Sequence, residues 1–485
     1  MMLLVVILYT IALSYIFVYS VYQLFLVVFY LKSCLKTEEK NQCLDYPIVT
    51  IQLPIYNERY VADRLIDAVC CIDWPKEKLE IQLLDDSTDQ TSEIVAQKVI
   101  FYKEKGFNIS HIIRETRIGF KAGALKNGLS LSKGEFIAIF DADFLPKKDF
   151  LKSTIGFFNK KNVGVVQTRW SHINDKFSLL TRLQAFALNS HFSIEQKGRS
   201  EAGFFINFNG TAGVWRKKCI EDSGGWQSDT LTEDLDLSYR AQLKGWEFVY
   251  VKSIDSPAEL PITINALKNQ QFRWSKGAAE CAKKNLMKTL RSYQLTFFQK
   301  ISAFFHLTNS FMFVCMMLLI VLSVPIVYMG LNNSYYESYL DLTRVFVIST
   351  FLLGLTYFIS NFNLKSPLFS ILYFVFLFPL FLSFCMGIGL YVSIGVIQGF
   401  FGVKSDFIRT PKFNIINRNY VGTNIYDRVT FKPVLVFEFL LMLYSFFGLF
   451  YCLKSSSYFM LVFILMIAIG TGYSSFNSIR HALVK

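Results

Sequence analysis

The sequence predicts an α/β domain with a mostly parallel sheet, inserted between transmembrane α-helices. Two observations lead to this fold class. Long uncharged apolar runs lie at both ends of the 485-residue chain, which is 52% hydrophobic with a mean hydropathy of +0.34. Between them, residues 45–265 have the sequence pattern of an ordinary globular domain, in which short β-branched runs alternate with helical segments. Such a distribution is typical of one globular domain combined with a membrane region.

The N-terminal run predicts a retained transmembrane helix. Residues 2–31 carry no charged side chain and are followed by Lys32 and Lys36. A cleaved signal peptide has a basic start, a shorter apolar core and a small-residue cleavage site, and this run has none of these. We therefore expect residues 1–32 to span the membrane with their basic end in the cytoplasm.

The central region contains three short apolar runs that are typical of strands, at 48–53, 79–84 and 136–140. Segments 92–105 and 122–131 separate them and have helical patterns. Strand and helix in alternation predict a parallel sheet with helices on its faces. Ligands of such sheets bind beyond the carboxyl ends of the strands, and pairs of aspartates follow the second and third runs.

The second half of the chain predicts a membrane region in four parts. Residues 266–306 are rich in Lys and Arg interleaved with Leu and Phe, which favours interfacial helices lying on the membrane surface. A transmembrane region (307–402), a basic cytoplasmic loop (403–432) and a C-terminal transmembrane pair (433–485) follow. The acidic loop 331–342 is expected outside the cell and the basic loop inside it. The chain must therefore cross the membrane an odd number of times between these two loops. The total is then five or seven spans, and we favour seven.

Charge and cysteine content exclude several classes of protein. The net charge of +13 comes from Lys and Arg concentrated beside the apolar runs, where anionic membrane lipids attract them. No zinc-finger spacing, leucine-zipper heptad or RNA-binding motif is present, so we expect no nucleic-acid partner. The nine Cys include no C-x-x-C pair, which favours a domain facing a reducing compartment.

Four short motifs carry the chemistry. They are Asp85-Asp86, Asp141-Ala142-Asp143, Thr232-Glu233-Asp234 and Gln270-Gln271-Phe272-Arg273-Trp274. Each alone has a structural explanation, as a helix cap, a chance triplet or a membrane-interface anchor. All four in this order indicate a single functional site.

The residue types in these motifs suit transfer of a sugar from a nucleotide-sugar. Asp141 and Asp143, alternate residues at the end of a strand, suit Mg²⁺ or Mn²⁺ that neutralises a diphosphate leaving group. Attack by a sugar hydroxyl requires a carboxylate that accepts its proton, and we assign this role to Asp234. Trp274 offers a flat face for an acceptor ring, and Arg273 a cation near phosphate.

The order of the motifs resembles that of family 2 glycosyltransferases of the cellulose-synthase-like kind, namely D, D-x-D, T-E-D and Q-x-x-R-W. The resemblance is greatest to the mannan, glucomannan and β-glucan synthase branch and covers about residues 45–300. The segments that support it are 52–58, 121–125, 166–170, 208–213 and 245–246.

This resemblance implies a GT-A (Rossmann-like) catalytic domain and an inverting mechanism with a β-linked product. It implies a nucleotide and diphosphate site made by Tyr56, Glu58, Asp85, Asp86, Lys121 and Asp141. It also implies that Asp143 holds the metal, that Asp234 is the base, and that Asn209 lines the acceptor site. Gln270, Arg273 and Trp274 would hold the acceptor end and the pyrophosphate.

Two later features bear on polymer formation. Residues 407–412 resemble the F-x-V-T-x-K gating loop of processive synthases, with Arg409 where an aliphatic residue is usual. The alternative is an ordinary basic juxtamembrane loop with a proline turn. Glu438 lies in an apolar run, where an ionisable residue either faces a bundle interior or polar path, or reaches the nearby interface.

The sequence favours a membrane-embedded hexosyltransferase that processively forms and exports a β-linked polysaccharide of β-1,4 glucan or mannan type. Its expected partners are a UDP- or GDP-hexose, a glycan or lipid acceptor and membrane lipids. The alternative is transfer of a single sugar to a lipid such as ceramide or diacylglycerol, since those enzymes share the same motif order. A non-catalytic transporter or scaffold is disfavoured because every expected acidic residue is present.

Overall fold

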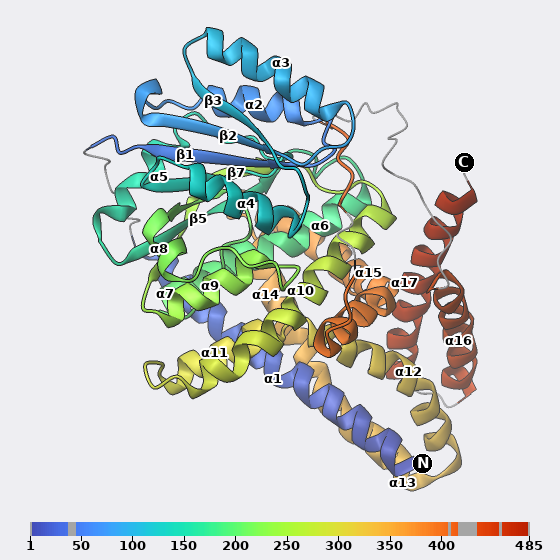
Figure 1. The fold of residues 1–485 in the computed structure, drawn as a ribbon. Coiled ribbons are helices and arrows are strands. Elements are labelled where there is room, and N and C mark those ends of the chain that lie inside the picture. The colour runs from blue at the N-terminus through green and yellow to red at the C-terminus, as the bar shows by residue number, and fades with distance from the viewer. Residues whose placement is uncertain (1, 37–44, 406–408, 416–433, 455–457, 484–485) are drawn as a thin grey trace.

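The computed structural model describes residues 2–36, 45–405, 409–415, 434–454 and 458–483 (Figure 1). A seven-stranded sheet with helices on both faces forms one part of the molecule, and a bundle of long helices extends from it. This arrangement confirms the predicted fold class, a mostly parallel α/β domain inserted between membrane helices.

The strands are β1 (Val49–Ile55), β2 (Leu79–Asp85), β3 (Asn108–Ile113), β4 (Phe136–Ile139), β5 (Val163–His172), β6 (Gly213–Arg216) and β7 (Glu247–Ala258). They lie in the order β3-β2-β1-β4-β6-β5-β7, and β6 alone runs antiparallel to its neighbours. Six strands therefore end, and β6 begins, at one edge of the sheet. Segments far apart in sequence meet at that edge because all their strands point toward it.

Helices cover the sheet on both faces and give the domain two apolar cores. They are α2 (Ala62–Cys70), α3 (Thr91–Glu104), α4 (Phe120–Leu131), α5 (Phe150–Ile155), α6 (Leu179–Ser190), α7 (Lys197–Glu201), α8 (Lys217–Asp222) and α9 (Glu233–Leu243). The larger core joins one face of the sheet to α2, α3 and α5, and the smaller joins the other face to α4, α8 and α9. The described residues also form four short segments of other helix types. Three are 3₁₀ segments (Lys76–Lys78, Gly156–Asn159, Arg344–Phe346), and one is a π-helical turn (His191–Gln196).

Two helices join the sheet domain to the bundle, α10 (Ile264–Arg291) and α11 (Phe297–Thr308). The sequence predicts that this region lies on the membrane surface, yet Lys268 and Lys276 of α10 are buried at 4% and 0% exposure. Both lie on the side of α10 that packs against other helices, whereas Lys283 and Lys288 are exposed. Helix α10 is therefore a packed element between the sheet domain and the bundle.

Six helical segments of the described residues are long and apolar enough to cross a membrane, which makes the chain an integral membrane protein. They are α1 (Met2–Cys34), α12 (Phe311–Asn332), α13 with α14 (Ser334–Thr343 and Val347–Asn361), α15 (Pro367–Phe401), α16 (Val434–Lys454) and α17 (Tyr458–Leu483). Figure 1 shows α1 and α14 side by side and α16 paired with α17.

The six candidates among the described residues are identified by length and apolarity, so the choice between five and seven crossings stays a prediction. The uncharged region between Lys365 and Lys404 forms one 35-residue helix, α15, instead of two spans. Its first part exposes apolar side chains such as Leu368 and Phe376, whereas Ile388 and Val392 in its second part are buried. Pro379 lies inside this helix without ending it, and tertiary packing distinguishes the two halves.

Candidate active site

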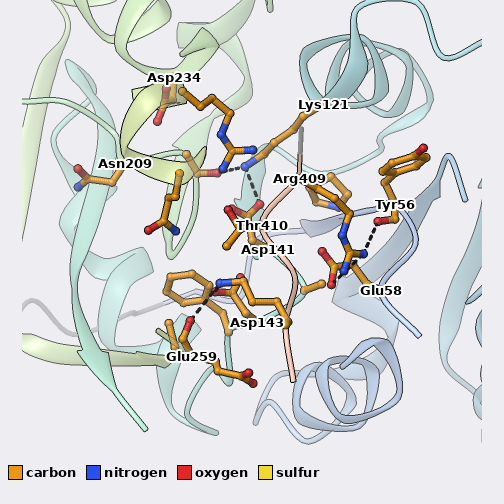
Figure 2. A pocket seen from close by; sticks show the side chains of 18 of the residues that line it. Tyr56, Glu58, Lys121, Asp141, Asp143, Asn209, Asp234, Glu259, Arg409 and Thr410 are labelled. Carbon is orange, nitrogen blue, oxygen red and sulfur yellow. Dashed lines mark hydrogen bonds and ion pairs between the residues drawn. The ribbon is translucent and has the colours of Figure 1, made fainter. Parts of the chain in front are cut away.

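A cavity of ≈ 190 Å³ lies at the edge where the strands end (Figure 2). It is lined by residues that follow β1, β2, β4 and β7, by the end of β5, and by the turn that precedes β6. The start of α9 and one side of α10 complete its wall. The cavity thus lies where ligands of parallel α/β sheets bind, and all four sequence motifs contribute to it.

Asp141 and Asp143 follow β4, and each carboxylate lies against a lysine. Lys121 Nζ donates to Asp141 Oδ1 at 2.5 Å and to the Gly210 carbonyl at 2.9 Å. Lys412 Nζ donates to Asp143 Oδ2 at 2.5 Å. Figure 2 shows both carboxylates pointing into the same space. The two carboxylates therefore form a site that attracts cations. In this structure the cations beside them are two lysine ammonium groups from distant segments of the chain.

The two carboxylates fit a divalent cation that shares its coordination with a diphosphate. The described residues contain no group of three or more His, Cys, Asp and Glu side chains that could hold a metal alone. A hard cation that bridges substrate phosphates is commonly held by only one or two protein carboxylates. Asp141 and Asp143, with the cation-attracting geometry described above, match that kind of site.

Asp234 lies at the start of α9, inside the cavity. Burial, and then the charge of neighbouring Glu233, raise the pKa of Asp234 to about 7. Helix α10 holds this segment closely: a Cβ on Gly277 would lie 2.5 Å from Thr232 Cγ2, so only glycine permits the contact. A carboxylate that titrates near neutrality beside a substrate cavity suits a general base.

The motif on α10 also lies in the cavity wall, since Gln270, Arg273 and Trp274 all line it. Burial lowers the pKa of Arg273, although nearby carboxylates led by Asp141 oppose this effect. The Trp274 ring lies 6.3 Å from that of Trp170 on β5. The α10 segment therefore brings one cation and one aromatic face to the carboxylates, as the sequence predicted.

Residues after β1 and β2 form the opposite side of the cavity. Tyr56 and Glu58 line it, and the Arg117 guanidinium lies 3.2 Å from the centre of the Tyr56 ring. Asp86 also lines it and binds Arg114 through both carboxylate oxygens, at 2.9 and 2.5 Å. Burial raises the pKa of Glu58 to about 8. This side presents an aromatic ring and several polar groups.

Asp85 is placed differently from the expectation. It is 1% exposed and does not line the cavity. Its carboxylate binds His111 Nε2 at 2.8 Å and accepts from the Ser87 backbone N–H at 2.9 Å. Burial raises its pKa, but these hydrogen bonds outweigh burial and lower it. Asp85 therefore fixes the end of β2, and its neighbour Asp86 faces the cavity.

Asn209 lies in the turn before β6, where Gly210 has a φ of +78° and its Cβ position lies 3.0 Å from Asp234 Oδ2. Asn209 Oδ1 accepts a hydrogen bond from Asn207 Nδ2 at 2.8 Å and lies 3.2 Å from His191 Nε2. Because β6 runs antiparallel to β4, this turn meets the end of β4 in the cavity. The position of Asn209 in the cavity, beside the carboxylates that follow β4, follows from that topology.

The structure adds cavity residues that the motifs do not include. Arg409 Nη1 donates to the Tyr56 carbonyl at 3.0 Å and lies 3.4 Å from Glu58 Oε2. Lys412 and Arg409 belong to the segment that resembles a gating loop, so this resemblance could have identified them as site residues. Phe407 and Ile408 of the same segment lie outside the described residues. Further lining residues are Arg117, Trp170, His172 and Glu259. Trp170 ends the segment 166–170 that supports the family resemblance, whereas the other three have no recognisable local pattern and are brought in by the fold.

Glu438 of α16 faces the interior of the bundle. It is 1% exposed, and Lys268 Nζ donates to its two oxygens at 2.8 and 2.7 Å. Lys268 also donates to Ser478 Oγ of α17 at 2.9 Å. Glu438 was expected either to face the bundle interior or a polar path, or to reach the membrane interface. The structure places it in the bundle interior. The ion pair joins the C-terminal helices to α10 two residues before Gln270.

The fold and the arrangement of acidic residues define the chain as a GT-A-type protein with membrane helices. Its fold is similar to that of a solved mannosyltransferase, PcManGT from Pyrobaculum calidifontis, in complex with GDP-Man and Mn2+. The similarity has a TM-score of 0.55 at 16% sequence identity and covers 82% of this chain and 100% of that chain. At this identity the similarity concerns the fold alone.

Sequence comparison then identifies the family. Residues 47–277 match the family described as "Glycosyltransferase like family 2". The chain is 41% identical over 313 residues to glucomannan 4-beta-mannosyltransferase 2 of Arabidopsis thaliana, covering 62% of this chain and 59% of the relative. It is 44% identical over 266 residues to glucomannan 4-beta-mannosyltransferase 1 of Oryza sativa subsp. japonica, covering 54% and 51%. The chain thus spans between half and three fifths of the length of these curated relatives. Residues 47–277 are therefore similar to family 2 of the glycosyltransferases, and the curated relatives are glucomannan mannosyltransferases, as the motifs predicted.

Proposed function

We propose that the chain is a membrane-embedded, inverting hexosyltransferase that transfers sugar from a nucleotide-sugar to a growing β-linked glycan. One observation carries this proposal: Asp141, Asp143, Asp234, Arg273 and Trp274 line a single cavity although they come from three separate parts of the chain. Mannosyl transfer is the favoured activity, because the curated relatives are named as 4-beta-mannosyltransferases. The product is then of mannan or glucomannan type.

In the proposed reaction, the acceptor hydroxyl attacks the anomeric carbon while the nucleoside diphosphate leaves from the opposite face. Asp234 accepts the hydroxyl proton, because its carboxylate lies in the cavity at the N-terminus of α9. Arg273 and Lys121 face the developing negative charge of the diphosphate. Tyr56, Glu58 and Asp86 surround the nucleotide, and Trp274 contacts the acceptor.

We propose Mg²⁺ or Mn²⁺ as the cofactor, held by Asp143 and Asp141. When bound, it neutralises the charge of the leaving diphosphate. The similarly folded archaeal mannosyltransferase was solved with Mn2+, which supports a divalent ion of this type. Lys412 Nζ pairs with Oδ2 of Asp143 in this structure, so a metal held by this carboxylate would lie beside the lysine or displace it.

We propose that the catalytic domain faces the cytoplasm. Lys32 and Lys36 follow the apolar part of α1, and α10 carries three exposed basic residues, Lys283, Lys288 and Arg291. Cytoplasmic flanks of transmembrane helices are enriched in Lys and Arg. The division of the chain expected from the sequence is retained in this proposal, with segments 1–32, 45–265, 266–306, 307–402, 403–432 and 433–485.

The full chain in lipid nanodiscs, supplied with labelled GDP-mannose, UDP-glucose or UDP-N-acetylglucosamine, tests this function. We expect labelled product of high molecular weight from GDP-mannose with Mn²⁺ or Mg²⁺, and none after addition of EDTA. Chloroform-soluble label would instead indicate transfer of a single sugar to a lipid. Absence of transfer from every donor would contradict the proposed activity.

The rate of transfer is expected to depend on pH through Asp234. With a pKa of about 7, Asp234 is protonated below neutrality and then lacks the electron pair that accepts the proton. We therefore expect kcat/KM for the acceptor to fall about tenfold per pH unit below about 7 and to level off above it. Initial rates at subsaturating donor and acceptor between pH 5.5 and 9 measure this profile. A flat profile across pH 7 would contradict the role of Asp234.

A further inference from the structure

The Q-x-x-R-W motif is the first part of a longer stripe on α10. Gln270, Arg273 and Trp274 line the cavity, and their spacing of three and four residues continues through positions 277, 280, 281, 284 and 285. Residues at this spacing lie on one face of a helix. Figure 1 shows this helix beside α9, whose first turn carries Asp234. The face that begins in the cavity wall therefore continues for about three turns beside the start of α9.

Glu280 on this face holds the chain just before Asp234. Its Oε2 accepts a hydrogen bond from the Leu231 backbone N–H at 2.7 Å. Leu231 lies in the segment between α8 and α9, outside helix and strand, so the Glu280 side chain takes the place of a hydrogen bond within such an element. Three residues earlier on α10, Gly277 lies against Thr232, where a Cβ would be 2.5 Å from Thr232 Cγ2. The helix and the segment that leads to Asp234 are therefore in direct contact.

Asn285 on the same face holds the chain just after Asp234. Its Nδ2 donates to Asp236 Oδ1 at 2.9 Å, and both residues are fully buried. The other oxygen of Asp236 accepts from Arg240 Nε at 2.8 Å and lies 3.0 Å from Lys284 Nζ. A buried hydrogen bond to a carboxylate meets no competition from water, so it fixes the position of both groups.

These two contacts lie on either side of the carboxylate that we propose as the general base. One lies three residues before Asp234 and the other two residues after it. Both come from the helix that carries Arg273 and Trp274, so the helix face sets the distance between the base and those two groups. A base must lie within about 2.6–3.2 Å of the proton that it accepts, and a misplacement of about 1 Å can cost about 10²-fold in rate. Holding the chain on both sides of Asp234 therefore serves the reaction as well as the fold.

We propose that Glu280 and Asn285 are positioning residues for the proton-accepting carboxylate, and that they hold the chain on both sides of Asp234 against the helix of Arg273 and Trp274. This inference rests on the proposed function, and it extends the active site to a helix face behind the cavity. Neither Glu280 nor Asn285 lines the cavity, so their effect on the reaction passes through Asp234. They are expected to affect kcat and not the binding of the donor.

Glu280→Met and Asn285→Leu remove the two hydrogen bonds and keep side chains of similar size. In the full chain in nanodiscs, each variant is expected to lower kcat about tenfold, because Asp234 is then displaced from the proton that it accepts. The donor KM and the affinity for nucleoside diphosphate are expected to change less than about twofold, since Tyr56 and Lys121 are untouched. Labelled-donor assays and calorimetry measure these values, and thermal unfolding in detergent checks the fold of each variant.

Glu280→Gln is the conservative variant. Burial raises the pKa of Glu280, while the bond from Leu231 and the charge of Lys276 oppose this effect, so an uncharged amide suits the position. Its oxygen still accepts the Leu231 N–H, and kcat is expected to stay within about threefold of wild type. Asp229→Asn is the matched control, because Asp229 also ties this segment to α10, through Lys284, but its side chain is 58% exposed. This control is expected to keep kcat within about twofold of wild type.

A double-mutant cycle with Asp234→Asn tests whether Glu280 acts through the base. Once the base is absent, its position no longer affects the rate, so Glu280→Met is expected to cost less than about twofold in this background. A tenfold loss in both backgrounds would overturn the proposal, because the side chain would then act on stability or on another group. The low residual rate is measured with labelled donor at high enzyme concentration over long incubations.

The outcomes separate this inference from the proposed function. If the wild-type protein transfers sugar and both single variants keep its kcat, the positioning role is wrong and the proposed function stands. If Asp234→Asn retains full turnover, Asp234 is not the base and the positioning role fails, although the transferase activity stands. If the wild-type protein transfers sugar from no donor, the proposed function fails, and this inference fails with it.

Discussion

Asp234→Asn is expected to lower kcat by about 10²–10⁴-fold, the usual contribution of a general base. Asparagine keeps the shape of the side chain, and its oxygen still accepts the Leu235 backbone N–H, which bonds to Asp234 Oδ1 at 2.9 Å. It cannot accept a proton from the acceptor hydroxyl. Since Lys121 and Arg273 remain near Asp141, binding of the nucleotide is expected to persist. Steady-state transfer and calorimetric titration with nucleoside diphosphate measure the two effects separately.

The matched control for this change is Asp229→Asn. Asp229 lies five residues earlier, its side chain is 58% exposed, and it pairs with Lys284. Surface substitutions of this kind usually change stability by about 0.5 kcal/mol or less, so kcat should remain within about twofold of wild type. If Asp234→Asn retained full turnover, a different group would be the base. If it lost nucleotide binding together with turnover, the carboxylate would serve the donor instead.

Lys268→Met is expected to destabilise the protein by about 3–5 kcal/mol, because it leaves a buried carboxylate without its partner. The two side chains are 5% and 2% exposed, so water does not compensate Glu438 when the ammonium is removed. The double variant Lys268→Met/Glu438→Leu removes both charges and fills the space with apolar atoms. We expect it to be more stable than the single variant, since replacing a buried ion pair by apolar residues is often close to neutral.

Thermal unfolding in detergent micelles, followed by intrinsic fluorescence, compares these variants. Lys288→Met on the exposed side of α10 is the control, and its effect is expected to stay within about 0.5 kcal/mol. Equal destabilisation by the single and double variants would show that the ion pair does not couple α10 to α16. A single variant as stable as wild type would lead to the same conclusion.

Much of the fold could be predicted from local sequence patterns. The apolar runs that end at Pro54, Asp85 and Asp141 identified β1, β2 and β4, because short β-branched segments that alternate with helical ones form a parallel sheet. The number of membrane helices could not be predicted in the same way. The run that forms α15 is apolar throughout, and only packing against α10 and α17 distinguishes its buried half from its exposed half.

The candidate site likewise contains some residues that the sequence could identify and others that only the structure shows. Asp141, Asp143 and Asp234 could be proposed as site residues from residue type, their place next to predicted elements, and family resemblance, and all three line the cavity. Their partners could not be. Lys412 reaches Asp143 from 269 residues further along the chain, and Trp170 meets Trp274 only because β5 ends beside α10. Both residues lie in segments that resemble the family, but no local pattern shows which carboxylate or ring they meet, since the contacts form only when the strands are ordered in the sheet.

The sequence by itself determined the fold class, the family resemblance and the acidic residues proposed for the candidate site, because each depends on short segments whose periodicity and spacing are local. The tertiary structure alone decided that Asp86 faces the cavity while Asp85 binds His111, and that Glu438 pairs with Lys268 inside the bundle. These outcomes depend on which side chains a packed interior can satisfy. Burial of a charge or an amide is tolerated only where a partner from a distant segment meets it.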